Sequence, residues 1–244
     1  MGIVCDINAA MHSEMRIGLI GDLNEQQRAH KAIPRALKAS AEEVEIVWIP
    51  TESTGDPQSL SGFDGFWCVP GMPYRSADGA MRAIRHARIT RTPFLGTSAG
   101  FQYAILEFAR DVLGLSEADH QKSNPRAGMP LISELGCALA GVHSRVRFMD
   151  GSRLRRAYGT PESIEEYHCS YGLNNRYRRM IEGNDLWVAA VDDQHDIRAV
   201  ELDGHPFFVA TLFQPEMRAD GSPIVRAFLK ACATRRNMAT KAAS

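Results

Sequence analysis

The sequence lacks the features of several protein classes. Among its 244 residues, 28 lysines and arginines nearly balance 29 aspartates and glutamates, so the formal net charge is −1. A near-neutral chain does not bind nucleic acid through bulk electrostatics, and we expect no nucleic-acid partner. No run of about 18 apolar residues is present, so we expect no membrane span. The N-terminal segment also lacks the basic start and apolar stretch of a secretory signal.

Cysteine is sparse and scattered. The five cysteines are an odd number, lie far apart and form no CxxC pair: Cys5, Cys68, Cys137, Cys169 and Cys232. This distribution argues against a disulfide framework and against a zinc site, and it favours reduced thiols in a cytoplasmic protein. No other spacing of potential ligands indicates a metal. We therefore expect neither a metal nor a cofactor.

Strand-like and helix-like segments alternate through the first half of the chain. The composition, with 44% hydrophobic and 23% charged residues, is that of a globular protein. Apolar runs predict strands at four places, and helical spacing predicts helices after the first and third of them: strands over 16–21, 44–50, 63–71 and 92–96, helices within 22–40 and 76–88. This alternation predicts an α/β fold with a mainly parallel sheet and helices on both faces.

The second half returns to β character. Strands are predicted over 186–193, 197–204 and 205–216, and the short gap between the first two predicts an antiparallel pair. Residues 125–160 show no clear pattern. We expect a flexible leader over 1–15, with Met15 an alternative start, then a single domain over 16–233 that ends in a helix, and a frayed basic tail over 234–244.

The segment Gly96-Thr97-Ser98-Ala99-Gly100 fits the pattern G-x-S-x-G between a predicted strand and a predicted helix. In such a turn the central side chain stands exposed above the sheet. The next backbone N–H, here that of Ala99, lies at a helix N-terminus and can stabilise an oxyanion. The alternative is a tight turn that needs two glycines and has no chemical role.

Four segments together resemble a known family. PFLGTSAGFQYAILEFAR resembles the nucleophile segment of class I glutamine amidotransferases, and VPGMPYRSADGAMRAIRHAR resembles their oxyanion strand. YGLNNRYRRMIEGNDLWVAAV and AVELDGHPFFVATLFQPE resemble the stretch that carries the family's His and Glu. The combination is most similar to the glutaminase domain of CTP synthase. The resemblance covers about residues 16–233 and implies a flavodoxin-like sheet with an antiparallel C-terminal extension.

The chain departs from that family at the reacting groups. The resemblance places Ser98 where the family has its nucleophilic cysteine and Gln214 where it has its histidine, whereas Glu216 is retained. A glutamine side chain cannot accept and return a proton near neutral pH, and general-base catalysis contributes about 10²–10⁴ in rate. We therefore expect this set to be a very poor acyl-transfer triad.

The implied substrate pocket differs as well. By ungapped counting, the acidic residue that pairs with the α-ammonium of glutamine falls at Lys122, and an arginine of the family falls at Ser170. Met72 follows Gly71 where the oxyanion strand has a second glycine, and Gln102 is retained. A lysine in place of a carboxylate repels an ammonium group and favours an anion or a neutral acceptor.

A second set of reactive groups lies on residues 165–170, the segment EEYHCS, shortly before Asn174 and Asn175. If this segment is a strand, Glu166 and His168 share one face, and the carboxylate can orient the imidazole. Cys169 then points to the other face. Two interpretations stay open: Cys169 is a relocated nucleophile served by His168 or another histidine, or it is an inert buried cysteine beside a structural histidine.

Three functions follow. The first is a stand-alone hydrolase that cleaves an amide, lactam or related C–N bond in a small acidic molecule and is not a glutaminase. The second is a non-catalytic binding or regulatory domain, and the third is a serine dipeptidase or amidase that uses Ser98. The expected partner is a small molecule, and a homodimer is left open. CTP synthesis is not expected, because no synthetase domain precedes this one. His30 and His86 lie in helical segments, where we expect them to face solvent.

Overall fold

The computed structural model describes residues 14–41 and 43–243. A ten-stranded sheet has the order β2-β1-β3-β4-β10-β9-β8-β6-β5, and β7 pairs with β6. The strands are β1 (Met15–Ile20), β2 (Val44–Ile49), β3 (Gly65–Cys68), β4 (Phe94–Thr97), β5 (Ala118–His120), β6 (Met129–Phe148), β7 (Glu162–Leu173), β8 (Leu186–Val191), β9 (Ile197–Leu202) and β10 (Phe208–Thr211). The α-helices are α1 (Arg28–Ser40), α2 (Ala77–Ile89), α3 (Ala99–Asp111), α4 (Arg153–Tyr158), α5 (Arg178–Ile181) and α6 (Pro223–Ala243).

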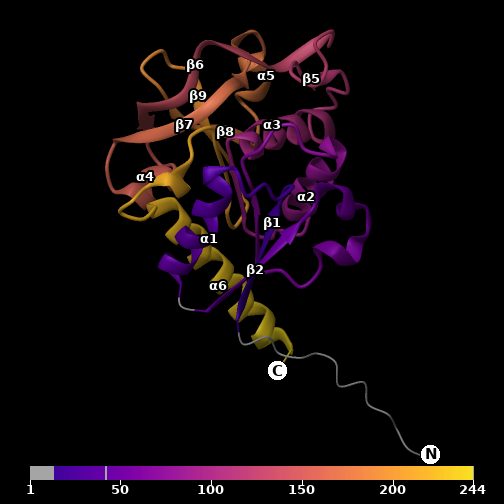
Figure 1. The fold of residues 1–244 in the computed structure, drawn as a ribbon, viewed down its shortest axis with the longest axis vertical. Helices are drawn as coiled ribbons and strands as arrows, with labels where there is room; N and C mark the ends of the chain where they lie inside the picture. The colour runs from indigo at the N-terminus through magenta and orange to yellow at the C-terminus, as the bar shows by residue number, and fades with distance from the viewer. Residues whose placement is uncertain (1–13, 42, 244) are drawn as a thin grey trace, which may run out of the picture.

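The first half of the sheet is parallel. β1 pairs in parallel with β2 and β3, and β4 pairs in parallel with β3 and β10. The helices α1 and α6 pack together on one face, and α2 and α3 pack together on the other (Figure 1). Strands β3, β4 and β10 are buried along their whole length, which explains their short continuous apolar runs. The predicted α/β fold is confirmed.

The second half of the sheet is antiparallel except at its edge, where β5 pairs in parallel with β6. β9 lies antiparallel to β10 and β8, and β6 lies antiparallel to β8 and β7. Residues 125–160, which show no clear pattern in the sequence, hold the 20-residue strand β6 and the short helix α4. The pairing of β6 with β7 shifts register twice, between Glu134 and Leu139 and between Ala140 and Val142. These irregularities interrupt the alternation by which a strand is recognised in a sequence.

Regular structure extends beyond both ends of the predicted domain. Strand β1 begins at Met15, inside the predicted leader, and residues 1–13 lie outside the described part. The predicted frayed tail 234–244 continues α6 as far as Ala243. This stretch contains no glycine or proline that would end a helix, and the Arg235 guanidinium donates to the Thr90 carbonyl at 3.4 Å. Among the described residues, no helix has both the length and the apolarity needed to cross a membrane.

The turn from β4 into α3 depends on two glycines. A Cβ atom on Gly100 would lie 2.2 Å from the Cys68 carbonyl oxygen of β3, and one on Gly96 would lie 2.8 Å from the Gly100 carbonyl oxygen. The two glycines therefore let α3 begin directly against the sheet. Ser98 stands between them at the edge where the parallel strands end.

Candidate functional site

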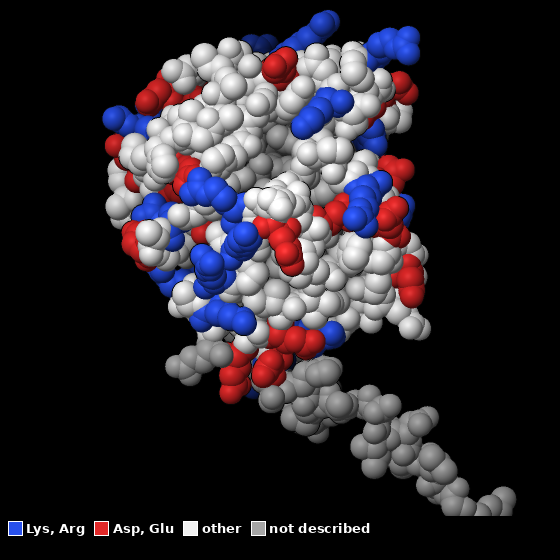
Figure 2. All heavy atoms as spheres, viewed as in Figure 1, with Lys and Arg blue, Asp and Glu red and all other residues white. Residues whose placement is uncertain are grey.

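A cavity of about 380 Å³ opens at the carboxyl ends of the parallel strands, beneath β7. Figure 2 shows this hollow below the β6–β7 pair, with walls mostly of uncharged atoms and a column of basic side chains over α1 beside it. Its lining residues come from α1, the β3–α2 loop, α3, the loop after β5, β7 and the loop after β10: Gln27, Arg28, Ala29, Pro70, Gly71, Met72, Ser98, Gln102, Lys122, His168, Cys169, Ser170, Tyr171 and Gln214. The fold thus brings most of the predicted site residues to one place.

Ser98 occupies a strained backbone conformation at the start of α3. Its φ of 55° and ψ of −105° lie outside the regions that non-glycine residues normally adopt. Its N–H donates to the Thr211 carbonyl of β10 at 2.8 Å, which holds the turn against the sheet. Ala99 follows as the first residue of α3, and Gly71, with φ of +137°, lines the same cavity. The predicted strand-to-helix turn is confirmed, and the helix N-terminus can stabilise negative charge beside Ser98.

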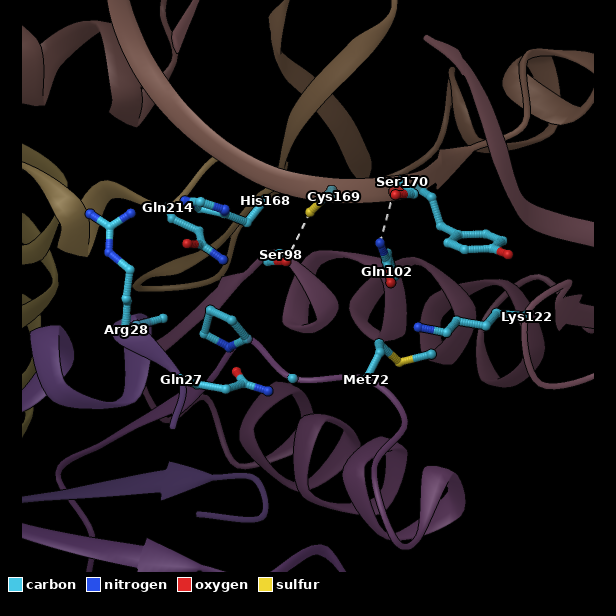
Figure 3. Close-up of a pocket in the computed structure, with 14 residues that line it drawn as sticks. Gln27, Arg28, Met72, Ser98, Gln102, Lys122, His168, Cys169, Ser170 and Gln214 are labelled. Carbon is cyan, nitrogen blue, oxygen red and sulfur yellow. Dashed lines mark hydrogen bonds between the residues drawn. The ribbon is translucent and has the colours of Figure 1, made fainter. Parts of the chain in front are cut away.

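Cys169 contacts Ser98 from the other side of the cavity. Its Sγ lies 2.8 Å from Ser98 Oγ, and Figure 3 shows the sulfur pointing at the hydroxyl. A second contact runs from Sγ to the Leu212 carbonyl oxygen at 3.5 Å. Burial raises the pKa of the thiol to about 11, against the opposing effect of the Ser98 hydrogen bond. A thiol therefore lies against the hydroxyl of Ser98, and its raised pKa keeps it protonated at neutral pH.

His168 and Glu166 form a pair on the face of β7 opposite to the one that carries Cys169. The His168 Nε2 atom lies 2.6 Å from Glu166 Oε1, and Arg28 of α1 donates to the same oxygen at 3.3 Å. His143 of β6 approaches the other carboxylate oxygen at 3.6 Å. Figure 3 shows the His168 ring beside Gln214 rather than over the thiol. No hydrogen bond joins this imidazole to Cys169 or Ser98 within the described part of the chain.

Gln214 and Glu216 lie on the loop after β10. Gln214 is buried, lines the cavity, and donates its backbone N–H to the Glu166 carbonyl at 2.9 Å. Glu216 is buried behind it and does not line the cavity. Its Oε1 accepts a long hydrogen bond of 3.5 Å from Thr97 Oγ1, and its Oε2 has no partner among the described residues. Desolvation raises the pKa of Glu216 to about 8, so this carboxyl is largely protonated at pH 7.

Lys122, Gln102 and Ser170 line the opposite end of the cavity (Figure 3). Lys122 follows β5, and its Nζ lies 5.9 Å from the centre of the Tyr171 ring. Gln102 of α3 donates its side-chain N–H to the Tyr171 carbonyl at 2.8 Å. Because a lysine lines the cavity here, this end of it carries positive charge.

Two expectations about histidines are wrong. His30 is buried, not solvent-facing: its Nε2 lies 2.6 Å from the Pro70 carbonyl oxygen and its Nδ1 accepts the Asn24 N–H at 3.0 Å. It therefore supports the loop that carries Gly71. His86 is half-buried and packs edge-on against Phe66. Helical spacing alone does not show which part of a helix passes under a loop.

Sequence reasoning missed three contributors to the site. Gln27 and Arg28 line the cavity from the start of α1, and His120 is buried behind Lys122. The signal for the first two is their place after a strand, because loops that follow parallel strands meet at one edge of the sheet. His120 gives no such signal. Within the described ranges, no group of three or more His, Cys, Asp or Glu side chains could hold a metal ion.

Comparison with known proteins shows the family of the chain. The family model for glutamine amidotransferase class-I matches residues 23–231. The chain therefore belongs to the class I glutamine amidotransferase family. It is 30% identical over 243 residues to a CTP synthase of Helicobacter pylori, covering 89% of this chain and 45% of that protein. It is also 30% identical over 251 residues to a CTP synthase of Rubrobacter xylanophilus, covering 95% of this chain and 45% of that protein. The chain thus spans less than half the length of these curated relatives.

Solved structures share the fold. The glutaminase domain of the Trypanosoma brucei CTP synthase with bound acivicin superposes with a TM-score of 0.81 at 23% identity, covering 90% of this chain and 94% of that one. A glutamine amidotransferase from Thermotoga maritima gives a TM-score of 0.59 at 10% identity, covering 92% of this chain and 99% of that one. The chain therefore has the class I amidotransferase fold and is similar to CTP synthase glutaminase domains.

Proposed function

We propose that this protein hydrolyses an amide, lactam or related C–N bond in a small acidic molecule, and that it is not a glutaminase. The observation that carries the proposal is the 2.8 Å contact between Cys169 Sγ and Ser98 Oγ. A thiol supplied by β7 lies at the turn where the family resemblance places a cysteine, next to the N-terminus of α3. Cysteine is the more nucleophilic of the two groups, so Cys169 is the proposed nucleophile and Ser98 its hydrogen-bond partner.

The proposed reaction has two steps. Cys169 Sγ attacks the carbonyl carbon, and its proton passes to the substrate nitrogen as the C–N bond breaks, which leaves a thioester. The oxyanion formed on the way accepts hydrogen bonds from the backbone N–H groups of Gly71 and Ala99. Water then attacks the thioester, which releases a carboxylic acid and restores the thiol. One water is consumed for each bond cleaved, and no oxidant or reductant is needed.

His168 is the proposed carrier of the thiol proton. It lines the cavity, and its Nε2 lies 2.6 Å from Glu166 Oε1, which orients the ring. Because the ring does not contact the thiol, transfer requires a water molecule or a substrate group between them. Burial raises the thiol pKa, so this transfer accompanies substrate binding rather than precedes it.

Three residues argue against glutamine as the substrate. Ser98 replaces the family's thiol, Gln214 cannot act as a base, and Lys122 repels the α-ammonium group of an amino acid. With Gln214 at the position where the resemblance places the family's histidine, general-base catalysis there is lost, and this contributes about 10²–10⁴ in rate. Turnover of glutamine is therefore expected to be at background level.

A binding protein without catalysis is the second candidate. The observation that favours it is the raised pKa of the Cys169 thiol together with the absence of a contacting base in the described part of the chain. In that case the cavity holds its ligand unchanged, and Cys169 behaves as a buried thiol.

The discriminating experiment combines turnover with trapping at the thiol. Purified protein is incubated with glutamine, short-chain monoamides of dicarboxylic acids, lactams and aspartyl dipeptides, and released amine or ammonia is measured. We expect no glutaminase activity, hydrolysis of at least one non-amino amide, loss of more than about 10³ of that rate in Cys169→Ala, and an acyl adduct on Cys169 by mass spectrometry.

Three other outcomes would contradict the proposal. Ammonia release from glutamine that is lost in Ser98→Ala would identify a glutaminase. Hydrolysis that survives Cys169→Ala and is lost in Ser98→Ala would identify a serine amidase. Saturable ligand binding with no product, no adduct and no iodoacetamide labelling of Cys169 would identify the binding protein.

A further inference from the structure

The Lys122 ammonium group carries the uncompensated charge of the cavity. It makes no ion pair with the residues that the structure describes, and none of the 14 lining residues is acidic. Other charged groups nearby are already paired. Arg28 contacts Glu166 at 3.3 Å, and Arg110 contacts Asp119, the second residue of β5, at 3.1 Å. Among the described lining residues, a ligand in the cavity therefore meets the unpaired positive charge of Lys122.

A chain of three hydrogen bonds, centred on the buried His120, fixes the loop that carries Lys122. The Lys122 N–H donates to His120 Nδ1 at 3.1 Å, and His120 Nε2 lies 3.0 Å from Gln102 Oε1. Since Nδ1 accepts, Nε2 carries the proton and donates to the Gln102 oxygen. Gln102 Nε2 then donates to the Tyr171 carbonyl at 2.8 Å. The chain joins the β5 loop, α3 and β7, the three elements that form this end of the cavity.

His120 keeps one tautomer over the physiological pH range. Its side chain is 1% exposed, and burial, aided by the charge of Lys122, lowers its pKa to about 4 against the opposing effect of Asp119. The neutral imidazole can therefore accept at Nδ1 and donate at Nε2 at the same time. The network holds the backbone of Lys122, and the ammonium group is left to meet a ligand.

We propose that Lys122 binds a carboxylate of the cavity's ligand, and that His120, through its bonds to Lys122 and Gln102, positions it. Figure 3 shows the Lys122 amine extending into the cavity from the end opposite Gln214 and His168. A cavity of about 380 Å³, with one unpaired cation among its described lining residues, fits a small monoanion better than a polyanion. Combined with the proposed function, on which this step rests, the ligand class is a short dicarboxylic acid monoamide, with the amide near Ser98 and Cys169 and the carboxylate at Lys122.

The test measures binding, not turnover, so it is independent of hydrolysis. Titration calorimetry is performed on the Cys169→Ala protein with glutaramate, the neutral diamide glutaramide, and glutamine. We expect glutaramate to bind about five- to tenfold more tightly than glutaramide, the range of a charged hydrogen bond at a partly exposed site. Lys122→Met should remove this advantage, so that glutaramate and glutaramide bind with similar affinity. Equal binding of the two probes, or an advantage that survives Lys122→Met, would overturn the proposal.

The role of His120 is tested by the same ratio of affinities. His120→Ala should reduce the preference for glutaramate over glutaramide, and His120→Gln, whose amide can both accept and donate, should restore part of it. A general structural defect would weaken the binding of glutaramate and of glutaramide equally. A preference that is unchanged in His120→Ala, in a protein with a normal melting temperature, would show that His120 does not position Lys122.

If the hydrolase proposal fails and this one holds, glutaramate binds through Lys122 but is never cleaved. If this proposal fails and the hydrolase proposal holds, amides are cleaved with no preference for an anionic group. The two results are therefore distinguishable.

Discussion

At the scale of single residues, the cavity brings together a hydroxyl and a thiol from distant parts of the sequence. The hydroxyl of Ser98 lies on the strand-to-helix turn, and the sulfur of Cys169 reaches it from a residue 71 positions later. The retained Glu216 has no imidazole to orient among the described residues, and it is instead a buried acid with one oxygen unpartnered there.

Glu216 makes stability depend on pH. The unfolded chain releases this proton near the ordinary glutamate pKa of 4.5, whereas the folded protein holds it to about 8. Between these values folding takes up a proton, so the free energy of unfolding falls as pH rises, by about 1.4 kcal/mol per pH unit from this group. Glu216→Gln removes the titration. We expect the stability difference, variant minus native, to increase from pH 5 to pH 8.

Urea denaturation of both proteins across this pH range measures the effect. The other carboxyl groups are present in both proteins and cancel in the difference. A difference that stays constant with pH would show that Glu216 is ionised in the folded state.

The sequence allows some site residues to be predicted and not others, for a physical reason. Ser98 and the Glu166–His168 pair are predicted from local spacing, and Gln102 from the family resemblance. The contact of Cys169 with Ser98 depends on the register of β7 against β6 and on how that pair lies over α3, which no local pattern specifies. His120 is found only when its partners Lys122 and Gln102 are seen together.

At the scale of elements, the start of α3 tolerates no side chain at Gly100. A methyl group there would lie 2.2 Å from the Cys68 carbonyl oxygen and would push α3 away from β3. We expect Gly100→Ala to lower the free energy of unfolding by about 1–3 kcal/mol. Gly136→Ala is the matched control, since nothing that the structure describes lies within 4 Å of its added methyl group, and it should change stability by less than about 0.5 kcal/mol. Thermal denaturation compares the stability of the two variants. Equal losses of stability would contradict the close approach of Gly100 to the Cys68 carbonyl oxygen.

The pair α2–α3 is joined by an ion pair whose acidic member is buried. Arg88 donates to both oxygens of Glu107 at 2.6–3.0 Å, and the Glu107 side chain is 1% exposed. Burial raises the pKa of Glu107 and Arg88 opposes this. Arg88→Leu therefore leaves an unpaired buried acid, and we expect a loss of about 3–5 kcal/mol.

The double variant Arg88→Leu with Glu107→Leu should recover most of that loss, because it removes the uncompensated group as well. Chemical denaturation of the single and double variants checks both statements. A double variant as unstable as the single one would mean that the contact matters through packing rather than charge.

At the scale of the whole molecule, the parallel half of the sheet is predictable and the antiparallel half less so. The strands β1 to β4 are short apolar runs separated by helical segments. Connections between parallel strands of this kind are almost always right-handed crossovers, which restricts the possible topologies. Strand β6 is largely exposed along its middle, and its two register shifts hide the alternation. The helical continuation of α6 beyond residue 233 is missed because the tail is basic and polar, features that do not by themselves end a helix.

Three cysteines lie on different elements of the fold. Cys68 lies on β3 and Cys232 on α6, both fully buried in the core, whereas Cys169 lies on β7, which among the described strands pairs with β6 alone. Segments with few neighbours open at lower free energy than the core. In mild urea we expect a disulfide reagent to modify Cys169 before Cys68 and Cys232, as read by peptide mass spectrometry. Simultaneous modification of all three would indicate that the sheet opens as one unit.

The Ser98 hydroxyl belongs to the turn into α3, and the Cys169 sulfur belongs to β7. A small molecule bound between them would contact both elements and would oppose the local opening of β7 away from α3. Occupancy would then slow the exposure of Cys169 by the factor 1 + [L]/Kd while leaving Cys68 untouched. The rate at which Cys169 is modified therefore reports whether the cavity is occupied, and compounds can be screened for binding by this rate without an assay of turnover.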